Sequence, residues 1–246
     1  MSNKLFGLIG KNISYSFSRG FFSKKFEELH ISNTHSYVNF DIDAIEKFTT
    51  EIINQPNLVG CNVTIPYKQD IIPFLDELDN TAKEIGAVNT IKFIDGKKIG
   101  YNTDCYGFMY DIEKLIKPHH KKALILGTGG ASKAIAYALN QLGVAFTYVS
   151  RNPKKNEFSY HDLNEEVMSE YLVIINCSPV GTFPQINDAP NIPYQYITPK
   201  HLAYDLIYNP AETAFLKKFK EHNATICNGM RMLELQAEKA WSIWNS

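Results

Sequence analysis

The sequence predicts an α/β protein of two domains, and three observations lead to this prediction. Short apolar segments alternate with amphipathic segments along the first half of the chain, which implies crossover connections and a largely parallel sheet. A second alternation begins at residue 121, after the polar linker Lys117-Pro118-His119-His120. At 246 residues, the chain is long enough for one large or two small domains.

The composition excludes several classes of protein. Hydrophobic residues make up 44% of the chain, charged residues make up 21%, and the net charge is −1, which argues against nucleic-acid binding. No apolar run approaches the length of a membrane span, and the N-terminus lacks the pattern of a signal peptide. The four cysteines form no CxxC pair and are expected to be reduced thiols. We therefore expect a cytoplasmic protein.

The first half is predicted to contain strands, helices and one hairpin. Residues 5–10 form a short apolar run that ends in glycine, and residues 19–29 place Phe22, Phe26 and Leu29 at helical spacing. The expected elements that follow are a strand at 35–42, a helix at 43–52, a strand at 58–65, a helix at 69–78 and a hairpin at 87–104 that turns at Asp95-Gly96.

The second half opens with a helix at 105–116, and the boundary between the domains is expected near this helix. Strands are predicted within 171–179 and 201–210. The last helix, at 228–245, places five apolar residues on one face: Met230, Leu233, Ala237, Trp241 and Trp244. The adjacent histidines of the linker point apart and have no Cys/His cluster beside them, which favours a solvated loop over a metal site.

A glycine turn between a strand and a helix predicts a dinucleotide site. Gly127, Gly129 and Ser132 have the spacing G-x-G-x-x-(small) within "ALILGTGGASKAIAYAL". The first glycine permits a tight turn, the second lets the backbone approach a pyrophosphate, and the small third residue lets helix and strand pack closely. The N-terminus of the helix favours phosphate. The turn alone is a weak signal, but its position between strand and helix makes it a strong one.

The next strand ends in a basic turn, which favours NADP over NAD. An NAD site would place Asp or Glu about 20 residues after the glycines to bind the ribose. The chain instead has Ser150-Arg151-Asn152-Pro153-Lys154-Lys155, and a guanidinium can bind a 2′-phosphate through two hydrogen bonds. Without the glycine turn upstream, a basic surface turn would be an adequate explanation.

Polar segments in the first half are expected to meet at one crevice, because ligands bind outside the carboxyl ends of parallel strands. They are Ser14 to Ser18, Asn62 to Thr64, Gly86 to Thr90 and Asn102 to Asp104, together with Lys68. Their serines, amides and acid suit a small, polyhydroxylated, anionic substrate. Reduction of a ketone builds negative charge on oxygen, which an ammonium can stabilise and protonate. We therefore expect Lys68 to act as acid/base with Asp104 as its partner, although an isolated lysine is most often simply exposed.

The chain resembles the shikimate dehydrogenase family over nearly its whole length. The motifs that match, in order, are "SYSFS", "NVTIPYK", "GAVNT", "NTD", "GTGGAS", "SRNPKK", "NCSPVG", "YDLIY" and "GMRMLELQA". The resemblance implies an N-terminal three-layer α/β/α substrate domain, residues 1–103, onto which the C-terminal segment 230–246 packs back. It also implies a Rossmann-type doubly wound NADP-binding domain at 104–229.

The resemblance also implies roles for individual residues. Lys68 matches the catalytic lysine and Asp104 its carboxylate partner. Substrate-binding positions match as follows: Ser16 and Ser18 for the carboxylate with Tyr208 nearby, and Thr64, Asn89, Asp104 and Gln236 for the ring hydroxyls. Cofactor-binding positions match Gly127, Thr128, Gly129, Gly130, Ala131 and Ser132 for the phosphates, Ser150, Arg151, Asn152 and Lys155 for the 2′-phosphate, and Leu206 and Gly229 for the nicotinamide. No metal is expected.

The chain departs from the family pattern in two regions and at one further position. Near the start, Asn12 stands where the family has Pro, Tyr15 where it has His, and Arg19 where it has Pro, although both serines remain. In the basic turn, Asn152 and Lys155 replace Thr and Arg, and a lysine is a point charge that gives a looser grip on the phosphate. Arg231 replaces a frequent Gly.

The leading expectation is the reversible, NADPH-dependent reduction of 3-dehydroshikimate to shikimate, in aromatic amino-acid biosynthesis, by a monomer or homodimer. The first alternative is a quinate or quinate/shikimate dehydrogenase. Relatives that prefer NAD tend to carry an acid at the positions of Ser150-Arg151, so this alternative is less favoured. The second is a non-catalytic sensor of NADPH or shikimate, which would not need Lys68 and Asp104. The folate-linked dehydrogenases come third, because they lack the polar set of the first half.

Overall fold

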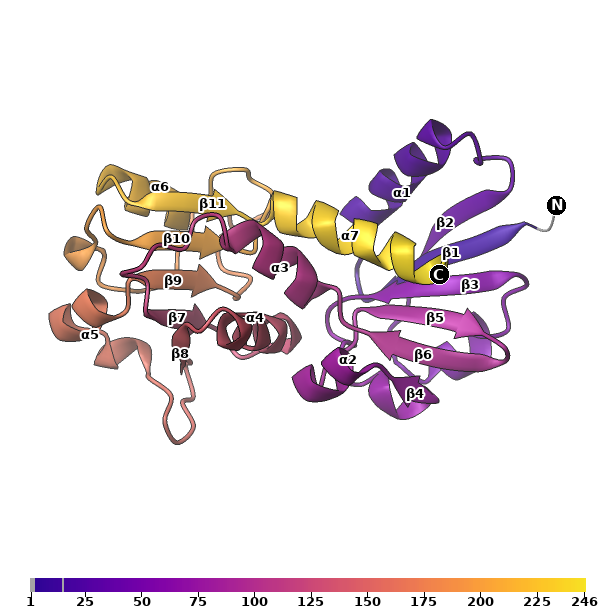
Figure 1. The fold of residues 1–246 in the computed structure, drawn as a ribbon, viewed down its shortest axis with the longest axis horizontal. Helices are drawn as coiled ribbons and strands as arrows, with labels where there is room; N and C mark the ends of the chain where they lie inside the picture. The colour runs from indigo at the N-terminus through magenta and orange to yellow at the C-terminus, as the bar shows by residue number, and fades with distance from the viewer. Residues whose placement is uncertain (1–2, 15) are drawn as a thin grey trace. The chain divides into compact units, whose positions relative to one another are not determined.

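The protein forms two compact units in a computed structural model that describes residues 3–14 and 16–246. The first unit contains residues 1–103 together with 236–246, and the second contains residues 104–235 (Figure 1). The last helix, α7 (Met230–Trp244), therefore contributes to both units. The division falls after residue 235, whereas the sequence analysis placed the whole segment 230–246 with the first unit.

The first unit is built on a six-stranded sheet with the order β2-β1-β3-β5-β6-β4. The pairs β1/β2, β1/β3 and β4/β6 are parallel, whereas β3/β5 and β5/β6 are antiparallel. The sheet is therefore mixed, and the prediction of a largely parallel sheet was wrong here. The strands are β1 (Lys4–Gly10), β2 (His35–Asp41), β3 (Leu58–Val63), β4 (Glu77–Leu78), β5 (Thr90–Ile94) and β6 (Lys97–Tyr101).

The predicted hairpin explains the antiparallel part of this sheet. Asp95 and Gly96, between β5 and β6, have φ of 50° and 75°. A two-residue turn with both φ values positive matches the twist of two antiparallel strands, and Asp-Gly is a favoured sequence for it. The turn was recognised correctly, but its consequence for the sheet was missed.

Two predicted helices of the first unit do not form. Within 43–52 there is only a π-helical turn, Phe48–Ile52, and the Thr49 hydroxyl donates to the Glu46 carbonyl, a local bond that competes with regular helix. Within 69–78 there is a 3-10 turn, Ile72–Phe74, before β4. Pro73 lacks the N–H that a longer helix would need. The helices that do form are α1 (Phe17–Glu28) and the unforeseen α2 (Asn80–Ile85).

Apolar side chains cover both faces of this sheet, which confirms the three-layer arrangement. One cluster joins strand residues such as Phe6 to Phe22 of α1 and to Ala237 and Trp244 of α7. A second cluster joins Val63 and other strand residues to the π-helical turn and the segments after β3. The C-terminal part of α7 therefore completes the core of the first unit.

The second unit is a doubly wound parallel sheet, as predicted. Its five strands have the order β11-β10-β9-β7-β8, and every neighbouring pair is parallel. The chain runs from β7 outward to β8 and then returns to β9 on the other side of β7, which makes the end of β7 the topological switch point. The strands are β7 (Lys122–Leu126), β8 (Ala145–Val149), β9 (Val173–Asn176), β10 (Leu202–Asp205) and β11 (Thr225–Asn228).

Four helices, the first part of α7 and two 3-10 turns complete the second unit. A buried cluster that includes Leu124, Ile174, Phe215 and Phe219 packs α6 against the sheet. The sequence analysis did not foresee α5, α6 or β11. The bounds are α3 (Asp104–Ile112), α4 (Gly130–Gln141), α5 (Glu165–Glu170) and α6 (Ala214–Glu221), with 3-10 turns at Tyr160–Asp162 and Tyr194–Tyr196.

His120 differs from the solvated loop that was expected, whereas linker residues 117–119 are exposed as expected. His120 is only 3% exposed. Its Nδ1 accepts the backbone N–H of Lys117 at 3.0 Å, and its Nε2 lies 2.9 Å from the carbonyl oxygen of Lys200. The ring therefore joins two loops of the second unit.

Candidate active site

Both predicted carboxylate-binding serines lie at the start of α1. Ser16 is the N-cap of this helix, and its hydroxyl accepts the N–H of Ser18 at 3.2 Å. Ser18 is 8% exposed and hydrogen-bonds the phenol of Tyr37, whose pKa is raised by burial despite this bond. Tyr15, whose role the sequence left open, lies outside the described residues. Arg19 is exposed.

Two predicted hydroxyl-binding residues, Asn89 and Gln236, meet in the first unit. Asn89 Nδ2 donates to Gln236 Oε1 at 3.2 Å and to Thr103 Oγ1 at 3.0 Å. Asn89 Oδ1 accepts the N–H of Thr103 at 2.7 Å. The two amides are 2% and 6% exposed, so these bonds hold both of them in one orientation. Segments far apart in the sequence thus build one polar cluster.

Lys68 and Thr64 follow the carboxyl end of β3, next to this cluster. Both side chains are half-buried. The carbonyl oxygen of Lys68 accepts the N–H of Val88 at 2.7 Å, and the carbonyl oxygen of Asn89 accepts the N–H of Val63 at 2.8 Å. These two bonds hold the segment that carries Lys68 against the "GAVNT" segment.

Tyr37 and Asn62 connect the serines to the amide cluster; the sequence analysis placed Asn62 in the polar set expected at the crevice but gave Tyr37 no role. The Tyr37 hydroxyl donates to Asn62 Oδ1 at 2.8 Å. Asn62 Nδ2 lies 3.3 Å from the carbonyl oxygen of Asn89 and 3.2 Å from the hydroxyl oxygen of Thr90. A hydroxyl group on a strand covered on both faces was the signal that could have found Tyr37.

The glycine turn lies at the switch point of the second sheet. Gly127 follows β7 with φ of 104°, a conformation that favours glycine, and its N–H bonds the carbonyl of Val149. Gly129 is the N-cap of α4 and has ordinary φ, yet a Cβ added there would meet nothing within 4 Å. Open space above the N-terminus of a 12-residue helix suits a phosphate.

The other residues of the phosphate loop continue into α4. Ser132 is fully buried, and its hydroxyl donates to the Gly129 carbonyl at 2.7 Å, so it shapes the turn from within. Thr128 is exposed, and Gly130 and Ala131 are half-buried in the first turn of the helix.

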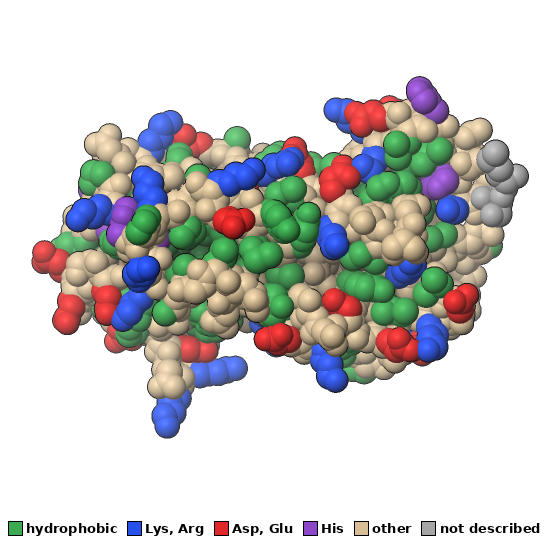
Figure 2. Space-filling model, viewed as in Figure 1, with side chains coloured by type: hydrophobic (Ala, Val, Ile, Leu, Met, Phe, Trp, Pro, Cys, Tyr) green, Lys and Arg blue, Asp and Glu red, His purple; other side chains and the backbone are tan. Residues whose placement is uncertain are grey.

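The basic turn follows β8. Arg151, Asn152 and Lys155 are exposed, while Ser150 is half-buried and its hydroxyl accepts the N–H of Asn152 at 3.2 Å. Figure 2 shows Lys and Arg side chains gathered on the loop that projects beyond β8. An accessible guanidinium and ammonium on a projecting loop can reach a phosphate from solvent.

Leu206 and Gly229 lie together at the ends of β10 and β11. A Cβ on Gly229 would be 2.2 Å from the carbonyl oxygen of Leu206, so a side chain at 229 would collide with backbone. Tyr208 lies half-buried just beyond Leu206. Arg231 is exposed and pairs with Glu234 at 2.9 Å, which accounts for its side chain without a ligand.

A buried carboxylate that the sequence analysis missed supports this segment. Asp205 is fully buried and accepts from Thr213 Oγ1 at 2.6 Å, Asn176 Nδ2 at 3.0 Å and the N–H of Ile207 at 3.1 Å. Burial raises its pKa to about 6, although these hydrogen bonds oppose the rise. The sequence signal that could have identified Asp205 was the presence of an acidic residue inside the otherwise apolar and aromatic motif "YDLIY".

Asp104 is the first residue of α3 and is 6% exposed. It belongs to the second unit, whereas Lys68 belongs to the first, so their pairing remains a prediction. Thr103, which precedes Asp104, bonds Asn89 as described above.

The described residues hold no cluster of three or more His, Cys, Asp or Glu side chains that could bind a metal. All four cysteines are free. No helix within residues 3–14 and 16–246 has the length and apolar character needed to cross a membrane.

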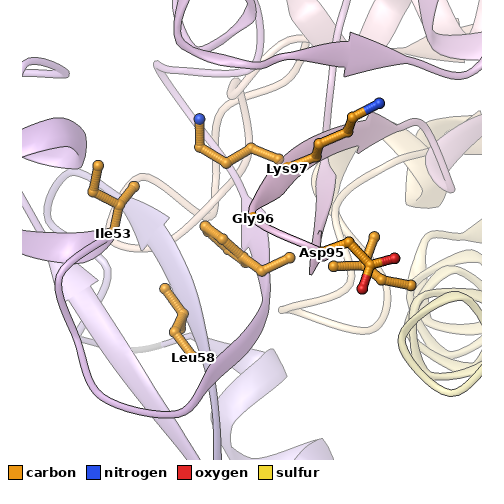
Figure 3. Close-up of a pocket in the computed structure, with 8 residues that line it drawn as sticks. Ile53, Leu58, Asp95, Gly96 and Lys97 are labelled. Carbon is orange, nitrogen blue, oxygen red and sulfur yellow. The ribbon is translucent and has the colours of Figure 1, made fainter.

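A separate pocket of about 370 Å³ lies at the opposite end of the first sheet, where β3 begins and the β5–β6 hairpin turns. In Figure 3, Ile53 and Leu58 lie on one side of it and Asp95 and Lys97 on the other. None of the predicted site residues lines this pocket.

Comparison with known proteins points to one family. The family model described as the shikimate dehydrogenase substrate binding domain matches residues 8–91. The NADP(+) shikimate dehydrogenase of Desulforamulus reducens is 35% identical over 97% of this chain and 88% of its own. That of Methanosphaera stadtmanae is 38% identical over 97% of this chain and 90% of its own.

Solved structures agree with these relatives. The shikimate dehydrogenase of Aquifex aeolicus is 37% identical, covers 99% of this chain and 92% of its own, and superposes with a TM-score of 0.88. The shikimate 5-dehydrogenase of Thermus thermophilus, solved with NADP(H) and shikimate, is 27% identical with a TM-score of 0.86, over 98% of this chain and 93% of its own. Because relatives at 35% to 38% identity match nearly its whole length, the chain belongs to the shikimate dehydrogenase family.

Proposed function

We propose that this protein is an NADP-dependent shikimate dehydrogenase that interconverts 3-dehydroshikimate and shikimate in aromatic amino-acid biosynthesis. The observation that carries the proposal is the identity of 35% to 38%, over 97% of the chain, to relatives with this activity. The doubly wound sheet with its glycine turn and the polar cluster of the first unit provide the two kinds of binding group that the reaction needs.

The first unit is proposed to bind the substrate. Ser16 and Ser18 bind the carboxylate, with Tyr208 nearby, and Thr64, Asn89, Asp104 and Gln236 bind the ring hydroxyls. The bonds between Asn89, Thr103 and Gln236 support this assignment, because amides held in one orientation give a hydroxyl fixed donors and acceptors. The substrate domain then comprises residues 1–103 and the C-terminal segment that packs on it.

The second unit is proposed to bind NADP. The backbone from Gly127 to Ser132 would hold the pyrophosphate at the N-terminus of α4. The 2′-phosphate would contact Ser150, Arg151, Asn152 and Lys155, and the nicotinamide would lie beside Leu206 and Gly229. The open space at Gly129 and the exposed basic turn fit such a ligand.

Lys68 is proposed as the acid/base. NADPH, when bound, supplies the hydride. In the reduction, the Lys68 ammonium donates a proton to the ketone oxygen as negative charge builds there, and in the oxidation Lys68 takes this proton back. Asp104 is proposed to keep the Lys68 ammonium directed at the oxygen. The Val88–Lys68 and Thr103–Asn89 bonds support this pairing, since they anchor Lys68 and the residue before Asp104 to the adjacent residues Val88 and Asn89.

We further infer that the protein acts in the cytoplasm as a monomer or homodimer. Four free thiols suit a reducing compartment.

The test is an assay of the purified chain with shikimate and NADP+, following the absorbance of the reduced nicotinamide. The proposal expects turnover with shikimate and a kcat/KM for NADPH far above that for NADH. Quinate is assayed in parallel, and a higher kcat/KM for quinate would favour a quinate dehydrogenase. Binding of shikimate without turnover at high enzyme concentration would favour a sensor.

A further inference from the structure

The loop that carries Ser16 and Ser18 is anchored by two side chains of β2. Asp41 accepts the backbone N–H groups of Asn12 and Ile13, at 2.8 and 3.1 Å, one on each carboxylate oxygen. Asn39 Nδ2 donates to the carbonyl oxygen of Ile13 at 2.9 Å. The peptide groups on both sides of Ile13 are therefore held from the neighbouring strand.

This anchoring coincides with a departure from the family pattern. Asn12, which stands where the family has proline, has φ of 57°. Proline locks φ near −65° and has no N–H. The conformation seen here, with the Asn12 N–H bonded to Asp41, is therefore closed to proline, and the loop is held by the Asp41 carboxylate instead.

The anchor leads directly to the serines. The carbonyl oxygen of Ile13, held by Asn39, also accepts the N–H of Ser16 at 3.1 Å. Ser16 caps α1 and bonds the N–H of Ser18 at 3.2 Å. Ile13 is 6% exposed, so its side chain adds a packed contact to these bonds. A shift of Ile13 would therefore shift both serine hydroxyls.

Asn39 has a second feature that fold stability does not explain. Its Oδ1 is the one buried side-chain N or O atom without a hydrogen-bond partner in the part of the chain that the structure describes. A buried acceptor without a partner is destabilising. The amide therefore adds less to the stability of the fold than its single bond to Ile13 suggests, and its contribution lies in the placement of the loop.

We propose that Asp41 and Asn39 are positioning residues for the carboxylate end of the substrate, acting through Ile13 on Ser16 and Ser18. This inference rests on the proposed function. The carboxylate takes no part in the chemistry, so interactions with it are similar in the ground and transition states. Loosening them raises KM without lowering kcat, since a disordered loop must be ordered at the moment of binding.

The experiment compares D41A and N39L with two matched controls. D43A removes a nearby carboxylate that pairs with Lys47, and N54A removes an exposed amide that donates to the carbonyl of Thr50. In D41A and N39L the KM for shikimate should rise about two- to tenfold, the effect of one or two hydrogen bonds. The kcat and the KM for NADP+ should stay within about twofold of wild type.

Two further measurements exclude a merely structural role. The first uses a shikimate analogue with hydroxymethyl in place of the carboxylate. With this analogue as substrate, D41A and N39L should have the same kcat/KM as the wild-type enzyme. Amide hydrogen exchange across residues 11–19 should be faster in D41A than in D43A, with the other β2 amides unchanged and the thermal midpoint of N39L no lower than that of wild type.

The outcomes separate this inference from the proposed function. Equal kinetics and equal exchange in D41A and D43A overturn the inference, as does a loss of kcat that is the same for shikimate and its analogue. A wild-type chain that does not turn over shikimate overturns the proposed function, and the exchange measurement then still decides whether Asp41 and Asn39 hold the loop.

Discussion

Lys68 shows how one side chain can be placed by backbone bonds around it. Its carbonyl accepts from Val88, and the next residue in that segment, Asn89, holds the polar cluster. The lysine side chain is half-buried, in contrast to the full exposure typical of lysine. A cation in such a position can both stabilise charge on a substrate oxygen and give it a proton.

The K68A variant should therefore lose about 10²- to 10⁴-fold in kcat, the contribution typical of a general acid/base. Its KM for shikimate should change much less, because the carboxylate and hydroxyl groups of the substrate bind elsewhere. Steady-state kinetics measure both constants, and K47A, which removes a half-buried lysine that pairs with Asp43, serves as control. A K68A enzyme with near-wild-type kcat would remove Lys68 from the mechanism.

Two glycines of the first unit have opposite expected responses to alanine. A Cβ on Gly60 would lie 2.2 Å from Trp244 Nε1, and this indole donates to the carbonyl of Ile91 at 2.9 Å. G60A should lower the free energy of unfolding by about 1–3 kcal/mol through overpacking. G20A, in α1 with nothing within 4 Å, should raise it by about 0.5–1 kcal/mol. Urea denaturation measures both, and similar shifts in the two variants would contradict the packing seen at Trp244.

At the scale of elements, β7, the glycine turn and α4 form one strand–turn–helix unit. Gly127 permits the turn through its positive φ, Ser132 supports it from below, and Gly129 leaves space at the helix end. The positive φ explains the first glycine, Gly127, whereas no neighbouring protein atom requires glycine at position 129. The proposed binding of a phosphate would explain the absence of a side chain there.

G129S should separate these two effects. Serine is a favoured N-cap and Gly129 has ordinary φ, so the thermal midpoint should not fall. The hydroxymethyl group would occupy the space left for phosphate, so the KM for NADP+ should rise by about tenfold or more, the effect of losing about 1.4 kcal/mol. G127A, strained at φ of 104°, should instead lose stability by about 1–3 kcal/mol. An unchanged KM for NADP+ in G129S would place the pyrophosphate elsewhere.

At the scale of the whole molecule, three histidines and Asp205 link folding to pH between about pH 5 and pH 7. Burial lowers the pKa of His35, His120 and His201 below the ordinary value of 6.5. Such groups contribute stability that is present above pH 6.5 and is lost as the pH falls through their folded pKa values. Asp205 has the opposite sign: its pKa is raised to about 6, so its contribution is lost as the pH rises through that value.

The free energy of unfolding should therefore fall between about pH 7 and pH 5, with the histidines as the cause and Asp205 as a partial offset. In D205N the stabilising effect of Asp205 protonation is absent, so the free energy of unfolding should fall more steeply with decreasing pH. Urea denaturation across this range, with wild type and D205N side by side, measures the two slopes. A shallower slope in D205N would contradict the sign assigned to Asp205.

Local patterns were sufficient for much of the fold. Strand segments 5–10 and 35–42, the helix at 19–29, the Asp95-Gly96 turn and the strand–turn–helix at 122–141 all appear in the structure. Each was indicated by the residue pattern within its own segment, although the strands among them pair with strands that are distant in the sequence. The helix expected at 69–78 does not form, because Pro73 interrupts the apolar spacing that predicted it. The segment 43–52 contains only a π-helical turn.

The sequence by itself determined the family, through the order and spacing of its motifs, and the residue types available for chemistry. Only the tertiary structure decided that the first sheet is mixed, that Tyr37 and Asn62 join Ser18 to Asn89, and that Asp41 and Asn39 hold the serine loop. The physical reason is that these hydrogen bonds join residues 19 or more positions apart in the chain. Such contacts depend on strand order and register, which periodicity within a segment does not specify.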